Sequence, residues 1–395
     1  MAVVTTARDA AAILAGLPDL LARLDVGVAA RERRRELPHD AVAELRRSGL
    51  LSLRIPVEHG GAGGTIVDQM RAVMAIASVD SNLAQGVRPH FFFIEELRTH
   101  GTAELGARWW PRLAAGAVVG NALSEATAAR PGLIASRLRR QDDGSWRLSG
   151  TKSYSTGALF ADLLFISGKD DDDQDRTVLV PVDREGISLI DDWDGMGQRT
   201  TATGTTQLRD VRVEPEELVA LRTLEERFTH VGGHRQLFLG AVLAGIAENA
   251  AREAAAYVRS KARPSAHGLT ETATTDPYVL RAVGVISSAA FAARASVLAA
   301  AEALDRAAVS PCEQDALAAS IDVARAQAAI ADLVLTATQA VFDTGGASAV
   351  RDELNLHRHW RNARTVLAHN PVDYKRKVVG DWVVNATEPP RNSYF

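Results

Sequence analysis

The spacing of apolar residues divides the chain into three stretches. Between residues 7 and 117 apolar side chains recur every three or four positions, which is the period of an amphipathic helix. Between residues 118 and 221 that period gives way to short β-branched runs, such as residues 177–182, separated by closely spaced turn residues. From residue 225 to about 350 helical periodicity returns over long alanine-rich stretches. The pattern therefore predicts a small antiparallel β-domain between two helical domains.

We place the domain boundaries where this pattern changes. An N-terminal helical domain spans residues 1–117, a central β-domain spans residues 118–224, and a C-terminal helical domain spans residues 225–395. A chain of 395 residues is long enough to bury a large core across such domains.

Charge and cysteine content narrow the class of protein. A net charge of −4 with 24% charged residues is ordinary for a soluble chain, so we expect neither a nucleic-acid nor a membrane partner. Cys312 stands alone, which excludes an intramolecular disulfide and a cysteine-based metal cluster and predicts a cytoplasmic location. Arg294 interrupts the apolar residues 284–304, as expected of a helix buried in a bundle rather than a membrane span.

Common catalytic motifs are absent from the sequence. It contains no GxGxxG or Walker phosphate loop, no HExxH or similar metal-ligand spacing, and no Gly-x-Ser-x-Gly nucleophile elbow. We therefore expect no metal site and no phosphate loop of these types.

Chemically active side chains concentrate near the C-terminus instead. Residues 356–371 read LHRHWRNARTVLAHNP and are followed by Tyr374 and Lys375. Cationic, imidazole and aromatic groups in an otherwise alanine-rich helical region make a poor core. The segment is therefore predicted to form a site.

This segment resembles the C-terminal part of the acyl-CoA dehydrogenase superfamily, where a glutamine and paired glycines precede an arginine-rich helix and a catalytic Tyr-Glu-Gly. Here Gln339 and the pair Gly345 and Gly346 precede the helix, and residues 368–370 read Ala-His-Asn in place of Tyr-Glu-Gly. That version is similar to the flavin-dependent monooxygenase branch, the group of dibenzothiophene monooxygenase and of relatives that oxidise indoles or amino sugars. The resemblance assigns both glycines to cofactor binding.

The resemblance covers essentially the whole chain and implies its fold. Residues 49–61, for example, resemble a signature of the N-terminal part of the superfamily. The implied fold has an α-helical N-terminal domain, a central antiparallel β-domain and a C-terminal four-helix bundle. It also implies a homotetramer, a dimer of dimers assembled through the C-terminal helices.

Residues 120–125 occupy the place of the superfamily strand whose backbone binds the pyrimidine edge of the flavin. This resemblance assigns cofactor contacts to Asn121, Leu123 and Ser124. The alternative for each is a strand position chosen for its β propensity.

Residues 150–157 resemble the strand whose hydroxyl lies beside flavin N5. This resemblance assigns that hydroxyl to Thr156 and places Tyr154 over a face of the flavin ring. In relatives, basic residues after the long helix hold the flavin phosphate, which assigns Arg263 to that role and suits a guanidinium fork. A solvated helix end is the alternative for Arg263.

The resemblance also indicates a substrate pocket formed by His90, Trp193 and Asn370. His90 precedes three phenylalanines, residues 91–93, so a packed core histidine is its alternative role. Trp193 either forms a wall of the cavity or only packs. The phenylalanine cluster slightly favours an apolar aromatic substrate.

The two chemistries of the superfamily need different groups. A dehydrogenase removes an α-proton with a carboxylate while hydride leaves for the flavin. Both positions where the superfamily places that glutamate lack one here, since one holds His369 and the other falls near residues 234–236, which read His-Arg-Gln. A histidine base remains open.

A monooxygenase instead needs a dry site with hydrogen-bonding groups around a C4a-hydroperoxyflavin. In the resembled branch a hydroxyl like that of Thr156 and a histidine like His369 stabilise that species, so both are assigned as catalytic. The ordinary pKa of histidine, about 6.5, suits proton transfer. A histidine at a helix C-terminus is the structural alternative for His369.

These observations predict a two-component flavin-dependent monooxygenase. It would use reduced FMN or FAD and O2 to oxygenate a small aromatic, heterocyclic or amine substrate. Because no nicotinamide-binding motif is visible, a separate flavin reductase is the expected partner. Two alternatives remain open: an acyl-CoA dehydrogenase with a displaced base, and a helical scaffold that has lost flavin.

Overall fold

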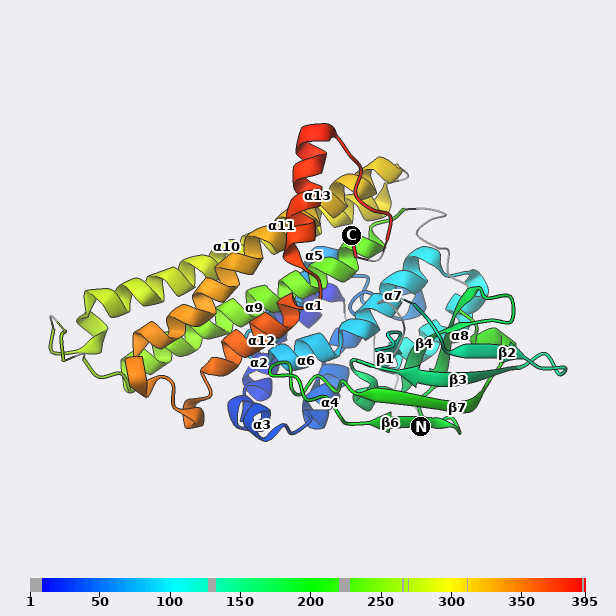
Figure 1. Ribbon diagram of the computed structural model, residues 1–395, viewed down its shortest axis with the longest axis horizontal. Helices are drawn as coiled ribbons and strands as arrows, with labels where there is room; N and C mark the ends of the chain where they lie inside the picture. Colours follow the sequence, from blue (N-terminus) through cyan, green and yellow to red (C-terminus); the bar gives the residue numbers. More distant parts are fainter. Residues whose placement is uncertain are drawn as a thin grey trace.

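A β-sheet lies at one end of the molecule, between N-terminal and C-terminal helices in chain order (Figure 1). The computed structural model describes residues 9–126, 133–219, 228–264, 266–268, 270–310, 312–392 and 394–395. The order of helices, sheet and helices predicted from the sequence is confirmed.

The N-terminal domain consists of short and medium helices, and side-chain caps set the starts of α1, α5, α6 and α8. The side chain of Thr65 accepts a hydrogen bond from the backbone of Asp68, whose own carboxylate accepts from the Thr65 backbone. The side chains of Asp80 and Thr102 each cap the start of a further helix by accepting hydrogen bonds from backbone N–H groups of its first turn. In the described residues the helices are α1 (Ala10–Ala15), α2 (Leu17–Leu24), α3 (Val28–Arg34), α4 (His39–Ser48), α5 (Ile66–Ala77), α6 (Ser81–Gly86), α7 (Arg88–His100) and α8 (Ala103–Ala114).

The central sheet is mostly antiparallel. Its strands are β1 (Val119–Ala122), β2 (Arg137–Arg140), β3 (Trp146–Lys152), β4 (Leu163–Lys169), β5 (Asp175–Pro181), β6 (Ile187–Ile190) and β7 (Thr205–Val213). The order across the sheet is β1-β4-β2-β3-β7-β6, with β5 also paired to β4.

One feature of the sheet differs from the antiparallel prediction. Strand β4 runs parallel to β1, and its last residue pairs in parallel with the first residue of β2. The chain passes through β2 and β3 between β1 and β4, and so long a connection allows two neighbouring strands to run in the same direction. Helices α7 and α8 cover one face of the sheet, where Phe93 lies 5.3 Å from Phe165 of β4, ring centre to ring centre.

The C-terminal domain is built on three long helices. Helices α9, α10 and α11 pack on one another, α12 crosses α9 and α11, and α13 packs against α11 (Figure 1). The bounds are α9 (Val231–Ser260), α10 (Pro277–Val309), α11 (Glu313–Ala340), α12 (His357–Leu367) and α13 (Val372–Asn385). Among the described residues, α10 alone is long and apolar enough by composition to cross a membrane, and here it belongs to the bundle.

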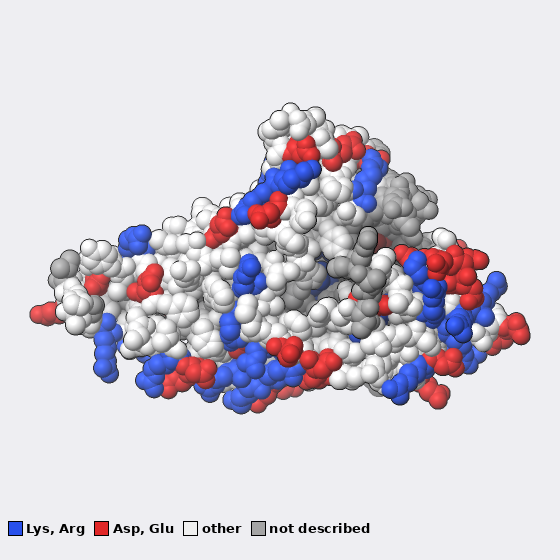
Figure 2. Space-filling model, in the orientation of Figure 1, with Lys and Arg blue, Asp and Glu red and all other residues white. Residues whose placement is uncertain are grey.

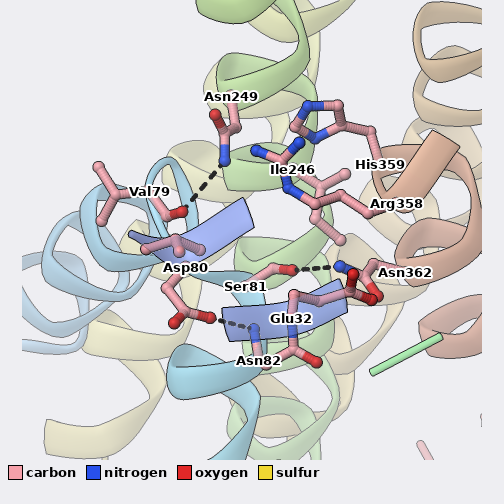
Figure 3. A pocket seen from close by; sticks show the side chains of 11 residues that line it. Glu32, Val79, Asp80, Ser81, Asn82, Ile246, Asn249, Arg358, His359 and Asn362 are labelled. Carbon is pink, nitrogen blue, oxygen red and sulfur yellow. Dashed lines mark hydrogen bonds between the residues drawn. The ribbon is translucent and has the colours of Figure 1, made fainter. Parts of the chain in front are cut away.

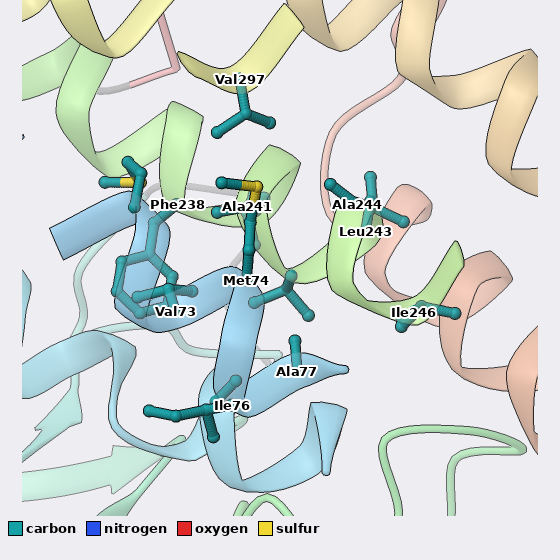
Figure 4. Packing of buried hydrophobic residues seen from close by; sticks show 14 of the residues in the cluster. Val73, Met74, Ile76, Ala77, Phe238, Ala241, Leu243, Ala244, Ile246 and Val297 are labelled. Atoms are coloured by element: carbon teal, nitrogen blue, oxygen red, sulfur yellow. The ribbon is translucent and has the colours of Figure 1, made fainter. Parts of the chain in front are cut away.

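The main core joins the two helical domains. Met74 and Ala77 of α5 face Leu243 and neighbouring apolar residues of α9 (Figure 4). Gly245 allows this close crossing, because a Cβ atom there would lie 2.4 Å from the Cβ of Ala77. The tight crossing fixes the position of α9 relative to α5 and to the neighbouring helices α6 and α7. Helices α6, α7 and α9 carry residues of the candidate site.

Candidate active site

His369 follows the C-terminus of α12 and contacts the first residue of α7. Its Nε2 lies 3.1 Å from Nη2 of Arg88. A guanidinium can only donate, so Nε2 accepts and the neutral ring carries its proton on Nδ1. The ring is exposed to solvent, yet burial by the surrounding protein, with the charges of Arg88 and Arg235, lowers the pKa of His369 to about 3. His369 is therefore a neutral imidazole beside Arg88.

The next residue anchors this loop to α9. Nδ2 of Asn370 donates a hydrogen bond of 2.6 Å to Oε1 of Gln236. Together, the Arg88 and Gln236 contacts hold the His369–Asn370 segment between α7 and α9. The predicted neighbours His369 and Asn370 thus face the same part of the molecule.

One face of α7 begins at Arg88, the residue that contacts His369. Arg88, Phe92 and Glu96 are spaced by four residues and therefore lie on the same side of the helix. The guanidinium carbon of Arg235 on α9 lies 3.8 Å from the centre of the Phe92 ring, a cation–π contact. Burial raises the pKa of Glu96 to about 7, against the opposing charge of Arg235.

Thr156 belongs to a chain of buried hydroxyl groups. Oγ1 of Thr203 lies 3.2 Å from Oγ1 of Thr156 and 2.7 Å from Oγ1 of Thr201. The only acceptor for the Thr156 hydroxyl proton among the described residues is the carbonyl of Tyr154, at 3.5 Å. Because that contact is long, the Thr156 proton is available to a bound molecule.

The loop of Thr156 also approaches the start of α7. A Cβ atom on Gly157 would lie 2.4 Å from the carbonyl oxygen of Gly86, and the φ of Gly157 is +72°. Only glycine fits this turn without strain. Gly86 lies two residues before Arg88, so the Thr156 loop and the His369 loop approach neighbouring residues of the chain.

Two aromatic side chains stand beside this loop. The rings of Tyr154 and Trp193 meet edge to face, with centres 6.0 Å apart. Tyr154 is 57% exposed and its φ is +57°, a backbone conformation that is uncommon outside glycine and often found at functional sites. Trp193 also borders a surface pocket of about 400 Å³ lined by Arg35, Asp191, Asp192, Trp193, Asp194, Gly195 and Arg199.

Buried amide and hydroxyl groups tie the loop before β7 to the helices. Oδ1 of Asn362 on α12 accepts from the backbone of Gln198 at 2.7 Å. Oγ of Ser81 accepts from Asn362 at 3.2 Å (Figure 3), and Oδ1 of Asn82 accepts from the backbone of Thr200 at 3.1 Å. These bonds explain the Asn within the Arg-Asn-Ala-Arg motif, because its amide fixes the loop that carries Trp193 and Thr203.

A small polar cavity adjoins this network and is lined by residues of α3, α6, α9 and α12 (Figure 3). Arg358 and His359 point from α12 toward Glu253 of α9 and bond to its carboxylate. Burial alone would raise the pKa of Glu253, but His359 and Arg358 hold it far below its ordinary value. This part of the motif therefore docks α12 on α9 through an internal ion pair.

The end of β1 offers a second, flatter surface. The backbone N–H of Asn121 donates to the carbonyl of Thr156 at 3.2 Å, and the Ser124 carbonyl accepts from Ser153 at 2.8 Å. Leu123 lies between them. Oδ1 of Asn121 is buried without a hydrogen-bond partner among the described residues. An orphaned acceptor needs a donor, so this edge, with the exposed Tyr154 ring nearby, fits a flat heteroaromatic group that carries an N–H, such as flavin.

The remaining residues assigned to the cofactor lie elsewhere. Arg263 is exposed just after α9. Gly345 packs on the ring of Tyr257 near the end of α9, next to Gly346, at the end of the bundle away from the sheet (Figure 1). Helix α9 has 30 residues and spans about 45 Å. One chain therefore does not bring these three residues to Thr156 and His369.

Two histidines prove to be interior residues. Nε2 of His90 bonds to the Leu51 carbonyl at 2.9 Å and Nδ1 to the Val119 backbone at 3.3 Å, so neither nitrogen is left for a substrate. This placement differs from the substrate-pocket role expected for His90, because α7 turns that face toward the sheet. His234 bonds to Gln69 at 2.7 Å. Burial lowers the pKa of each histidine to about 4.

Three residues around the contact of His369 with α7 and α9 were not identified from the sequence: Arg88, Arg235 and Glu96. A usable signal was the spacing of Arg88 and Glu96 on one face of an otherwise apolar helix. In the sequence, Arg235 is one of residues 234–236, which occupy a position where the superfamily places a catalytic glutamate. In the described residues no group of histidine, cysteine and acidic side chains could hold a metal ion.

Comparisons with known proteins place this architecture in a family. The models of the N-terminal, middle and C-terminal domains of acyl-CoA dehydrogenase match residues 21–117, 121–211 and 237–374. A curated relative, the "Probable FMNH2-dependent monooxygenase SfnC" of Pseudomonas putida, is 32% identical over 369 residues, 89% of either chain.

Solved structures of monooxygenases share the whole fold. TdsC from Paenibacillus sp. A11-2, a dibenzothiophene monooxygenase solved with FMN and indole, matches with a TM-score of 0.90 at 30% identity, over 97% of this chain and 99% of that one. The methanesulfinate monooxygenase MsuC of Pseudomonas fluorescens matches with a TM-score of 0.87 at 29% identity, over 97% of this chain and 99% of that one. The chain belongs to the acyl-CoA dehydrogenase family and, within it, to the branch of flavin-dependent monooxygenases.

Proposed function

We propose that the chain is the oxygenase component of a two-component monooxygenase, which receives reduced FMN from a separate reductase and oxygenates a small organic substrate. The observation that carries this proposal is the neutral His369, held by Arg88 where the resembled dehydrogenases place a carboxylate. The likeness to SfnC, named FMNH2-dependent, and to the FMN complex of TdsC supports FMN over FAD.

When bound, reduced flavin supplies two electrons to O2, so that one oxygen atom enters the substrate and the other leaves as water. The Asn121 edge and the Tyr154 ring bind and orient the cofactor in this proposal. Thr156 donates its weakly held hydroxyl proton to a bound oxygen. His369 donates from Nδ1, since Arg88 occupies Nε2.

Some residues assigned to the cofactor lie far from Thr156 and His369, which implies that several copies of the chain assemble. Because Arg263, Gly345 and Gly346 lie at the far end of the bundle, we assign them to the cofactor of a neighbouring copy in a homotetramer. Support comes from α10, whose Phe291 is 76% exposed. The bundle face carries few charged side chains, whereas charges gather along the edge over α3 and α4 (Figure 2). An exposed apolar helix face of this kind is typical of an interface.

We also propose that the protein is located in the cytoplasm. The free, exposed Cys312 suits the reducing cytoplasm, where reduced flavin is also produced. The proposed substrate is a small organic compound. The sequence predicts that it is aromatic, heterocyclic or an amine.

The decisive experiment follows the oxygen atom. The protein is mixed with NADH, FMN, an unrelated flavin reductase and 18O2, and offered methanesulfinate, dibenzothiophene or indole. We expect one 18O atom per product molecule, and no product without the protein. In the parallel assay, oxidised flavin on the protein stays oxidised when an acyl thioester is added anaerobically. Bleaching there, with no 18O incorporation, would establish a dehydrogenase instead.

A further inference from the structure

Arg88 is buried without a counterion. Its side chain is only 6% exposed. Within the described residues it makes one hydrogen bond, to the neutral His369, and its Nε has no partner. No carboxylate of the described chain forms an ion pair with it. A buried guanidinium in this state carries an uncompensated desolvation cost.

Arg235 of α9 is partly exposed and also has no carboxylate partner among the described residues. It stacks on Phe92 and takes part in no ion pair within the part of the chain that the structure describes. The nearest acidic group that influences it is Glu96, whose pKa of about 7 leaves it only partly ionised at neutral pH. Burial and the charge of Arg235 lower the pKa of Arg88 to about 9.

Other buried arginines of this chain are paired. Arg54 bonds to Glu95 at 2.7 Å, and Arg358 bonds to Glu253. These two arginines pair with a carboxylate that crosses between helices, as structural arginines do. Within the described residues, Arg88 and Arg235 therefore lack the carboxylate partner that the fold supplies to Arg54 and Arg358, although both act on the solvent-exposed residue His369.

We propose that Arg88 and Arg235 bind the anionic oxygens of the substrate, so that the oxygenated compound is a small sulfinate, sulfonate or carboxylate held beside His369. Two guanidinium groups offer the fork that matches such an oxyanion, and a bound anion offsets their mutual repulsion. This inference rests on the proposed function and deepens it, because it names the charge that the substrate carries.

The test measures binding apart from turnover. Titration calorimetry on the protein loaded with oxidised FMN compares methanesulfinate, methanesulfonate and benzoate with dimethyl sulfone, the neutral isostere of methanesulfonate. We expect the anions to bind and the sulfone to bind at least about tenfold more weakly. Arg88→Gln and Arg235→Gln should each weaken anion binding by about tenfold or more, whereas Arg88→Lys should restore part of it.

Arg98→Gln is the matched control, because it removes a charge from the exposed face of α7 and should change binding less than twofold. Failure of all three anions to bind, or equal binding of the sulfone, would overturn the inference. The same follows if the Arg88→Gln change weakens binding of FMN but not of riboflavin, since Arg88 would then hold the cofactor phosphate. Anion binding without 18O incorporation would instead remove only the proposed function.

Discussion

The guanidinium of Arg88 donates a hydrogen bond to Nε2 of His369 across 3.1 Å, although the two residues are 281 positions apart in the chain. The bond joins the start of α7 to the loop after α12. It assigns the proton of the neutral imidazole to Nδ1 and, together with burial, keeps the ring from becoming protonated. The properties of His369 are therefore set by a residue from another domain.

Replacing His369 should separate oxygen consumption from substrate oxygenation. In His369→Ala, we expect product formation to fall by about 100-fold while hydrogen peroxide release rises, because a donor to the bound oxygen is lost. FMN affinity should change little. Product and peroxide are measured in the same assay. His59→Ala, at an exposed position, is the control, and unchanged coupling in His369→Ala would contradict the assignment.

Removing the hydroxyl of Thr156 should have a similar but smaller effect. Thr156→Val keeps the shape of the side chain and removes its proton, so we expect about tenfold less product per FMN oxidised. The ratio of product to flavin oxidised provides the measurement. Thr151→Val, on the exposed side of β3, should leave that ratio unchanged. Equal ratios for the two variants would show that Thr156 has only a structural role.

The interior histidines predict how stability depends on pH. Burial lowers the pKa of His90 to about 4, so between pH 7 and 5 the unfolded chain binds a proton there and the native chain does not. The free energy of unfolding therefore falls as pH falls. In His90→Gln that decrease should be smaller by about 2 kcal/mol, measured by urea unfolding at both pH values. His39→Gln, on the surface, serves for comparison, and equal slopes would argue against a buried neutral His90.

The loop before β7 depends on a glycine. A Cβ atom on Gly197 would lie 2.2 Å from the carbonyl oxygen of Arg361. Gly197→Ala should therefore push the loop from α12, lower the free energy of unfolding by about 2 kcal/mol or more, and weaken FMN binding. At Gly380 in α13 a Cβ atom meets nothing within 4 Å, so Gly380→Ala should stabilise by about 0.5–1 kcal/mol. Thermal melts of both variants give the comparison.

A buried ion pair holds α7 to the loop after α4. Glu95 accepts from Nη2 of Arg54 at 2.7 Å and bonds to His230 at 2.8 Å. Glu95→Gln leaves the Arg54 charge buried and unpaired, so we expect a loss of about 3–5 kcal/mol in the free energy of unfolding. Glu44→Gln breaks exposed ion pairs with Arg47 and Arg23 and should lower the free energy of unfolding far less. Similar losses in urea unfolding would mean that the Glu95 pair is not insulated from solvent.

The fold was largely predictable because its signals are local. Helical and strand periods are read over a few neighbouring residues, and the three-domain fold class they indicated is confirmed. The parallel pairing of β1 with β4 was not predicted, since strand direction depends on how a long connection returns. The domain boundaries themselves remain a prediction.

The candidate site could be inferred only in part for a related reason. Motif resemblance led to Thr156, His369 and Asn370. In the structure the Thr156 loop approaches Gly86 at the end of α6, and His369 contacts Arg88 at the start of α7. The orientation of His90 was not accessible, because a shift of about two residues in a helix moves a side chain from the inner face to the outer one. The cofactor and substrate roles of Thr156, His369 and Asn370 remain proposals.

The sequence alone determined the order of the domains, the membership of the family and the missing glutamate, because each is recorded in residue types at short spacing. Only the tertiary structure decided which groups meet. Packing of α7 against α9 removes Arg88 from water without supplying a carboxylate, and it places Arg235 on the ring of Phe92. Desolvation and pairing are properties of the assembled interior, and no linear pattern contains them.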